Sequence, residues 1–274
     1  MGKGLSLHIG LNTIDVTKYT GKYQTLRNAE NDTNFYHELA VKNNYNARKL
    51  IGTEATSDNV LDSLKSFATQ LTSGDSLFIS YSGHGTRVKD LNGDEGDKFD
   101  EALVLYDRLF IDDEFQLCWA RFEEGVRIFF INDSCYNGSV TRFFEQHGEA
   151  LKSIFSDHVL RGIDNSESIV DFEKNISFYK SIKLGIDNKP VKASIIHIGA
   201  CQDNQLADDG VAQDKNGKFT IAVQKIYGNG TIQNSYKSFF NLVKNEMPPW
   251  QTPSWDNEAG KQDQEFENST FLII

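Results

Sequence analysis

Short apolar runs alternate with amphipathic segments along this chain. Four runs of six to eight residues are apolar over most of their length, namely 4–11, 76–81, 127–132 and 194–200. A shorter run, 47–51, is a further strand candidate. Strands that are covered on both faces of a parallel sheet have this continuous apolar character. The pattern therefore predicts strands of one largely parallel sheet.

The segment 57–71 has the clearest helical period in the sequence. Its apolar residues recur every three or four positions and so share one face: Val60, Leu61, Leu64, Phe67, Ala68 and Leu71. Segments 31–41 and 231–247 are predicted to be helices as well. Parallel strands need crossover connections, and helices between them supply these. We therefore expect an α/β fold, a three-layer sandwich with a mostly parallel central sheet and helices on both faces.

Three segments depart from this alternation. Residues 89–100 are polar and acidic and contain glycine, which predicts an exposed loop. Residues 149–190 have no clean period and are expected to form an insertion or linker with one or two helices. Residues 248–251 begin a proline-marked tail that ends in the apolar segment 270–274. That last segment could complete the sheet or meet a partner, and the sequence favours neither.

Charge and composition exclude several classes of protein. The chain has 274 residues, with 28 Lys and Arg against 39 Asp and Glu, and a formal net charge of −11. Nucleic-acid binding needs clustered basic residues, so a nucleic-acid partner is not expected. No run approaches the ~18 apolar residues that a membrane span needs. The first residues also lack the apolar stretch of a secretory signal. We expect a globular, cytoplasmic protein without a membrane partner.

Three cysteines stand far apart in the sequence, at Cys118, Cys135 and Cys201. An odd number at wide spacings argues against a disulfide framework and for a reducing compartment. Without a Cys-x-x-Cys pair, a structural zinc site is not expected either. One cysteine is therefore a candidate for chemistry.

Two candidate catalytic residues directly follow predicted strands. His84 lies between two glycines after the run 76–81, and Cys135 follows the run 127–132. Catalytic groups gather beyond the carboxyl ends of the strands in open α/β sheets. A cysteine nucleophile needs a nearby imidazole as base or ion-pair partner. Either residue alone would be interpreted as structural, whereas together they predict a thiol active site. Cys201 also ends a strand and is the rival nucleophile, and Cys118 is expected to pack in the core.

Several short motifs are spread over most of the chain: LHIGLN, LRNAENDTNF, ISYSGHG, DEALVLYD, IDDEF, INDSCYNGS, IGACQDNQLA, GKFTIAV and PPWQTPSW. In content and order they resemble the motifs of caspase-like cysteine peptidases, and of metacaspases in particular. His84 and Cys135 are 51 residues apart, which agrees with the spacing in caspases. The resemblance implies a single caspase-like domain over 1–274. It divides into a large-subunit-like part (1–148), a linker (149–190) and a small-subunit-like part (191–274).

The resemblance also implies roles for individual residues. His84 would be the general base and Cys135 the nucleophile, and the backbone N–H groups of Gly85 and Cys135 would form the oxyanion hole. Metacaspases cleave after Arg or Lys through an acidic pocket. The matching pocket positions are Asp32 and Asp133, with Ser82 beside them. Carboxylates in a concave site suit a guanidinium or ammonium group.

Some positions differ from the family pattern. Tyr136 and Asn137 replace His and Ser after the nucleophile, and Ala29 stands where a Cys is usual. Many metacaspases are activated by calcium, and Asp112 and Asp113 match part of the aspartate cluster that binds it.

Arg142, however, stands where a further acidic ligand is expected. The 89–101 segment resembles an EF-hand only in the spacing of its acidic residues, so a solvated surface is the preferred interpretation. We expect no required cofactor, with calcium left open.

Three functional hypotheses follow. The first is an endopeptidase that cleaves after Arg or Lys through a thioacyl-enzyme, and that is activated by self-cleavage in the linker. Basic residues there offer cleavage sites: Lys152, Arg161, Lys174, Lys180 and Lys183. The second is an inactive module whose acidic cleft holds a basic segment of a regulatory partner protein. The third is another thiol hydrolase, such as a transpeptidase or a C-terminal amide hydrolase.

Overall fold

A six-stranded sheet forms the centre of the computed structural model, in the order β11-β9-β7-β3-β1-β2. The structure describes residues 2–21, 23–89, 99–136, 155–163, 165–185, 190–202, 205–228, 234–256 and 260–274. Five strands are parallel: β1 (Gly4–Gly10), β2 (Asn46–Ile51), β3 (Ser76–Ser82), β7 (Arg127–Asp133) and β9 (Ser194–Gly199). Strand β11 (Ser254–Asp256) runs antiparallel at one edge.

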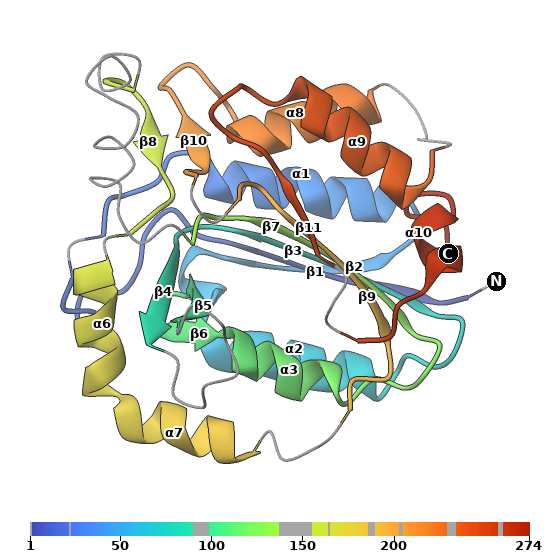
Figure 1. Cartoon of the computed structure of the whole chain (residues 1–274), viewed down its shortest axis with the longest axis horizontal. Helices are drawn as coiled ribbons and strands as arrows, with labels where there is room; N and C mark the ends of the chain where they lie inside the picture. Colours follow the sequence, from blue (N-terminus) through green and yellow to red (C-terminus); the bar gives the residue numbers. More distant parts are fainter. Residues whose placement is uncertain are drawn as a thin grey trace.

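Helices cover both faces of this sheet, as Figure 1 shows. On one face lie α1 (Ala29–Lys42), α8 (Lys218–Tyr227) and α9 (Tyr236–Glu246), and on the other lie α2 (Ser57–Ala68) and α3 (Asp112–Trp119). The predicted three-layer, mostly parallel α/β sandwich is confirmed.

The remaining elements lie around the sandwich. They are β4 (Gly85–Lys89), β5 (Phe99–Val104), β6 (Leu109–Ile111), β8 (Val159–Leu160), β10 (Asp208–Gly210), α6 (Asn165–Lys174), α7 (Ile176–Gly185), α10 (Gln264–Asn268) and the short helix η1 (Gly52–Glu54). Strands β4, β5 and β6 form a small antiparallel sheet, and β8 pairs with β10.

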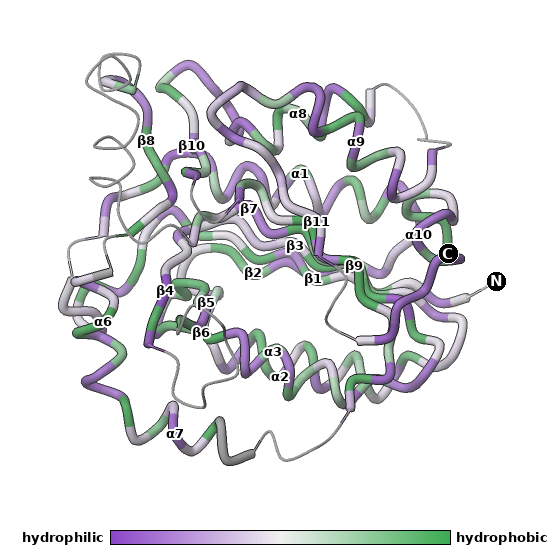
Figure 2. The backbone as a smooth tube through the Cα atoms, in the orientation of Figure 1, coloured by the Kyte–Doolittle hydropathy of each residue, from purple (hydrophilic) through white to green (hydrophobic). Residues whose placement is uncertain are grey.

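The sheet separates two hydrophobic cores, because successive side chains of a strand point to opposite faces. Phe78 of β3 stacks on Phe129 of β7 with ring centroids 5.4 Å apart, in the core beneath α9. Their neighbours Ile79 and Phe130 belong to the other core, together with Leu64 of α2. The apolar strand centres stand out in Figure 2. Burial on both faces explains why these strands are continuously apolar in sequence.

Several predicted boundaries differ in the structure, most clearly those of one helix and one loop. The helix expected from residue 231 begins at Tyr236, because the Ser235 hydroxyl caps it by accepting a hydrogen bond from the Ser238 N–H (3.2 Å). The loop expected over 89–100 was wrong at both ends, since Lys89 ends β4 and Asp100 is a buried residue of β5.

The C-terminal apolar segment does not complete the central sheet. Phe271 instead stacks on Phe239 of α9, with ring centroids 3.9 Å apart. Within the described ranges, no helix combines the length and apolar character needed to cross a membrane.

Candidate active site

Strands β3 and β7 bring the two predicted catalytic residues to the same edge of the sheet. The strands pair in parallel with Ser82 opposite Asp133. His84 and Cys135 each follow two residues later, where the chain leaves the sheet. A Cβ atom on Gly85 would lie 2.6 Å from the Cys135 carbonyl oxygen, so the two loops touch. The absence of a side chain at Gly85 permits this close approach.

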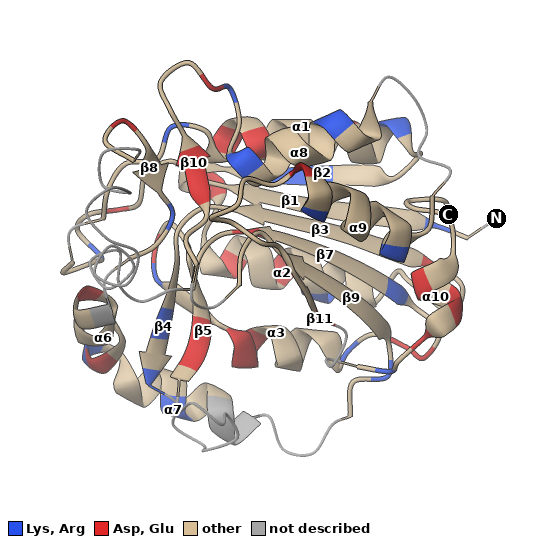
Figure 3. Cartoon of the chain, turned by 45° about the horizontal axis from the view of Figure 1, so that its top comes forward, with Lys and Arg blue, Asp and Glu red and all other residues tan. Residues whose placement is uncertain are grey.

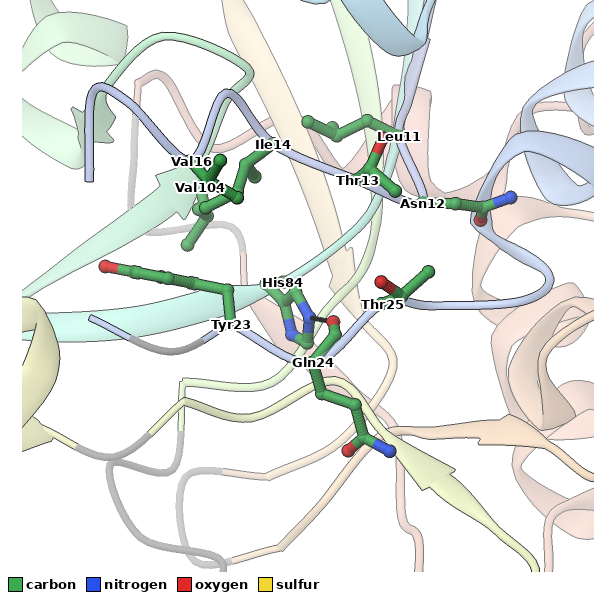
Figure 4. Close-up of a pocket in the computed structure, with 10 residues that line it drawn as sticks. All are labelled: Leu11, Asn12, Thr13, Ile14, Val16, Tyr23, Gln24, Thr25, His84 and Val104. Atoms are coloured by element: carbon green, nitrogen blue, oxygen red, sulfur yellow. Dashed lines mark hydrogen bonds between the residues drawn. The ribbon is translucent and has the colours of Figure 1, made fainter. Parts of the chain in front are cut away.

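A backbone carbonyl fixes the orientation of the His84 imidazole. Its Nε2 lies 2.5 Å from the backbone carbonyl oxygen of Gln24 (Figure 4). Because a carbonyl only accepts hydrogen bonds, Nε2 carries the proton and Nδ1 is left as a base. Burial lowers the pKa of His84, while the carbonyls of Gln24 and Arg161 partly oppose this effect. A neutral imidazole with a free Nδ1 lone pair suits proton abstraction from a thiol.

The Cys135 thiol lies against a second cysteine. Its Sγ donates to the backbone carbonyl of Gln205 at 3.0 Å, and the Cys201 Sγ lies 3.7 Å from the same oxygen. Contact with the Cys135 thiol, followed by burial, raises the pKa of Cys201. Cys118 packs in the core on the other face of the sheet, where burial raises its pKa to about 12. Cys118 and Cys201 are therefore both held as thiols.

Arg161 fills an acidic pocket at this edge of the sheet. Its side chain is fully buried and reaches three carboxylates. Nη2 lies 2.5 Å from Asp32 and 2.7 Å from Asp209, and Nη1 lies 2.8 Å from Asp133. Nε adds a hydrogen bond to Asp209 at 3.1 Å. The structure therefore brings the two predicted pocket residues together, around a basic residue of the predicted linker.

Each pocket carboxylate is fixed by a different element. Asp32 lies in the first turn of α1 and accepts hydrogen bonds from Asn216 and from the Gly217 N–H (2.9 and 3.1 Å). Asp133 ends β7 and accepts from the Thr220 hydroxyl of α8 (2.9 Å). A Cβ atom on Gly217 would lie 2.6 Å from Nη2 of Arg161, so this glycine forms the wall over the guanidinium.

The third carboxylate, Asp209 of β10, was missed by sequence reasoning. Figure 3 shows β10 as an acidic segment. Asp209 accepts from the backbone N–H groups of Arg27 and Asn28 at 2.6 and 3.1 Å. The sequence signal was the pair Asp208 and Asp209 after IGACQDNQLA. Successive side chains of a strand alternate in direction, so the sequence does not say which of the two points inward. Asp208 points elsewhere, to Nδ1 of His158 at 2.7 Å.

Burial of three carboxylates around one guanidinium changes their titration. Burial is the largest influence and raises the pKa of Asp32 to about 7, with Asp133 adding to the increase and Arg161 opposing it. Burial also raises the pKa of Asp133. The three carboxylates raise the pKa of Arg161 well above its ordinary value, against the effect of its own burial. The three carboxylates therefore stabilise an occupant that stays positively charged.

The backbone around Arg161 is bound like an added strand. The Arg161 N–H donates to the Ala207 carbonyl at 2.9 Å, and Leu160 pairs with Asp208 in an antiparallel bridge. The Gly85 N–H donates to the Arg161 carbonyl oxygen at 3.1 Å, and Gly162 forms a bridge with Gly85. A main-chain strand with one side chain in a deep pocket is how extended peptides are recognised.

Two further predictions concern the pocket role of Ser82 and a calcium site. Within the described residues, the buried Ser82 hydroxyl has no hydrogen-bond partner, so its predicted pocket role has no contact to support it. Carboxylate oxygens of Asp100, Asp112 and Asp113 lie within 4.8 Å of one another, which suits oxygen ligands of calcium. Arg142 and residues 90–98 lie outside the described residues.

Comparison with known proteins identifies the fold family. A model of the caspase domain matches residues 13–272. The chain belongs to the caspase domain family, which comprises cysteine-type peptidases. This caspase domain is 33% identical to a protein from Geobacter sulfurreducens whose crystal structure superposes with a TM-score of 0.83, over 99% of both chains.

Named relatives of this caspase domain are metacaspases. It is similar to Metacaspase-1 of Schizosaccharomyces pombe, with 27% identity over 213 residues, which cover 69% of this chain and 49% of that protein. Metacaspase-1B of Aspergillus oryzae is 26% identical over 90% of this chain and 65% of its own length. Metacaspase-7 of Arabidopsis thaliana is 34% identical over 53% of this chain and 38% of its own length. The chain thus spans about half to two thirds of the first two relatives.

Proposed function

We propose that this caspase domain is a cysteine endopeptidase that cleaves after arginine and, less well, after lysine. The observation that carries the proposal is Arg161, whose guanidinium sits among three carboxylates while its carbonyl oxygen accepts from the Gly85 N–H. An arginine presents Nε, Nη1 and Nη2 in a fixed fork that matches several carboxylates. A lysine ammonium offers a single charged centre to the same groups, so we expect arginine to be preferred.

The proposed chemistry uses Cys135 and His84. His84 Nδ1 takes the thiol proton, and the Cys135 sulfur attacks the carbonyl carbon of the arginine. The oxyanion that forms is stabilised by the Gly85 N–H. The intermediate then collapses to a thioester while His84 gives its proton to the departing amine. Water, deprotonated by His84, attacks the thioester and releases the carboxylate product and the thiol.

The first substrate in this proposal is the chain itself. We assign Arg161 as the residue before the cleaved bond. The bond that would be cleaved therefore joins Arg161 to Gly162. While the segment is intact it occupies the pocket and excludes other substrates. Cleavage would leave Arg161 at a free end, from which it can depart. Self-cleavage therefore becomes the activating step.

The Cys135 thiol has to change partner before it reacts. A thiol that donates its proton to the Gln205 carbonyl stays protonated, whereas catalysis needs transfer of that proton to an imidazole. No cofactor enters the proposed steps. If calcium is needed, Asp100, Asp112 and Asp113 are the residues that would hold it.

Self-cleavage is the direct test. The purified protein is incubated with calcium or with chelator, and the new N-terminus is read by mass spectrometry. We expect a fragment that begins at Gly162, and none from Cys135→Ala or Arg161→Ala. Lys174→Ala, in the same linker, is the matched control and should be cleaved like the wild type.

Peptides ending in Arg, Lys or Asp before a fluorogenic group test the pocket. We expect turnover in the order Arg, then Lys, with Asp not cleaved. Preference for Asp would refute the pocket, and activity that survives Cys135→Ala would refute the nucleophile. An intact chain without peptide turnover under either condition would instead favour the module that only binds a basic segment.

A further inference from the structure

The residue two positions after Arg161 is also buried. Ile163 is only 4% exposed, although it lies in the same linker segment. It joins an apolar group outside both cores of the central sheet. We name this group the prime-side cluster, with these members besides Ile163: Tyr19, Val88, Ala102, Val104, Leu109, Ile111, Phe172 and Tyr179.

The walls of the prime-side cluster come from separate parts of the fold. Val88, Val104 and Ile111 belong to the small sheet β4-β5-β6, whereas Phe172 and Tyr179 come from α6 and α7. Figure 1 shows α6 beside strand β4 of this sheet, with α7 following it below α3. The two walls are joined to each other without Ile163, since the Tyr179 hydroxyl of α7 donates to the Leu109 carbonyl of β6 at 3.0 Å.

A buried carboxylate fixes α6, which forms one wall of the prime-side cluster. Asp171 of α6 is 3% exposed and accepts from the Thr20 N–H at 2.5 Å and from the Tyr23 hydroxyl at 2.6 Å. Tyr23 and Ile14 pack against the prime-side cluster from the segment that follows β1. The arrangement is therefore held from two sides by hydrogen bonds.

The prime-side cluster adjoins the catalytic base. Ile14, Tyr23, Val104 and His84 line one hollow of about 80 Å³, which is partly open to solvent (Figure 4). Gly162 forms a bridge with Gly85, the residue after His84, so the chain beyond the proposed cleaved bond begins next to the base that lines this hollow. In the proposed reaction this is the side of the departing amine.

We propose that the prime-side cluster is a substrate subsite that selects an aliphatic side chain at the second position after the cleaved bond. The inference rests on the proposed function, because it uses Arg161 as the residue before that bond. Its substrates are peptides with Arg, then a small residue, then Ile, Val or Leu. Ile163 occupies the subsite in the uncleaved chain and competes with such substrates afterwards, because α6 keeps its segment in place.

Matched internally quenched peptides test this subsite. One contains Val-Leu-Arg-Gly-Ile, and the other has Ser in place of that Ile. Burial of an isoleucine side chain predicts a kcat/KM about tenfold higher for the Ile peptide. Ile163→Ser should enlarge this ratio several-fold by removing the internal competitor. Val170→Ser, at a position 47% exposed on α6, is the matched control and should leave the ratio unchanged.

A wall variant gives a second readout if Ile163→Ser does not fold. Ile14→Asp places a charge at the hollow and should reduce the ratio to about one. Val41→Asp, at a position 53% exposed on α1, should not. Equal turnover of the Ile and Ser peptides by the wild type would overturn the inference.

A third substrate separates this failure from failure of the proposed function. Val-Leu-Arg-aminomethylcoumarin has no residue beyond the cleaved bond and reports only on the pocket and the catalytic pair. If it is hydrolysed while the two peptides are equal, the subsite alone is refuted. If it is not hydrolysed, both the proposed function and the subsite that rests on it are refuted.

Discussion

The acidic pocket and the prime-side cluster bury two side chains of one segment by opposite means. Arg161 is fully buried by charge, in contact with Asp32, Asp133 and Asp209, whereas Ile163 is 4% exposed in apolar surroundings. Removing a partner from a buried ion cluster leaves charges without compensation, which is costly. Removing an apolar side chain loses only its transfer free energy and some packing. The acidic pocket should therefore dominate both stability and specificity.

The largest expected effect is the loss of Arg161 from the uncleaved chain. In a Cys135→Ala background, which prevents cleavage, Arg161→Ala should lower the free energy of unfolding by about 3–5 kcal/mol, because three buried carboxylates then face one another. Urea unfolding at pH 8, where the carboxylates are most ionised, measures this. Arg48→Ala, at an exposed position, should have little effect. A loss below about 1 kcal/mol for Arg161→Ala would contradict the ion-cluster interpretation.

The next effect concerns the carboxylate that sequence reasoning missed. Asp209 makes two contacts to the guanidinium, at 2.7 and 3.1 Å. Hydrogen bonds to charged groups contribute about 1.5–3 kcal/mol each. Asp209→Asn should therefore reduce kcat/KM for arginine peptides about a hundredfold. Asp208→Asn, the adjacent residue that pairs with His158, should reduce it much less. Equal losses from the two variants would show that β10 acts only as a structural strand.

The wall over the guanidinium gives a smaller, more selective effect. Gly217 has φ −64°, so an alanine there is free of backbone strain, but its Cβ would lie 2.6 Å from Nη2 and 3.0 Å from Cζ of Arg161. Gly217→Ala should lower kcat/KM for arginine about tenfold and affect lysine less, because an ammonium group has no planar fork to clash. The ratio of the two kcat/KM values measures this, and an unchanged ratio would contradict the assigned wall.

The smallest effect is a pH dependence of substrate binding. The pKa of Asp32 is about 7 with Arg161 in place, and the guanidinium lowers it, so the empty pocket has a higher pKa. Binding of arginine therefore releases a proton and becomes tighter as pH rises through about 7. KM for an arginine peptide should fall several-fold between pH 6 and 8. Asp32→Asn should flatten this profile, and a KM that rises with pH would show that the sign is wrong.

Much of the fold could be predicted from local patterns. The apolar runs at 76–81 and 127–132 became β3 and β7, because strands buried on both faces must be apolar throughout. The same runs placed His84 and Cys135 beyond strand ends, where parallel pairing made them neighbours. Helix ends were less predictable. The helix predicted over 231–247 begins only at Tyr236, because the Ser235 hydroxyl caps its first turn.

The occupant of the pocket could not be predicted from local patterns. The five basic residues named as cleavage candidates were equivalent in sequence, whereas the pairing of Leu160 with Asp208 brings Arg161 to the pocket. The inward direction of Asp209 likewise depends on this pairing and on the start of α1, 181 residues away in sequence.

The sequence by itself determined the α/β fold, the family motifs and the two residues proposed for catalysis. Those features depend on side-chain type and local period, which are written along the chain. Only the tertiary structure decided which cation fills the pocket, which third carboxylate completes it, and that Ile163 enters an apolar cluster beside His84. Contacts of the acidic pocket join residues that are 28 positions apart in one case and 181 in another, and burial and charge balance become defined only once these segments meet.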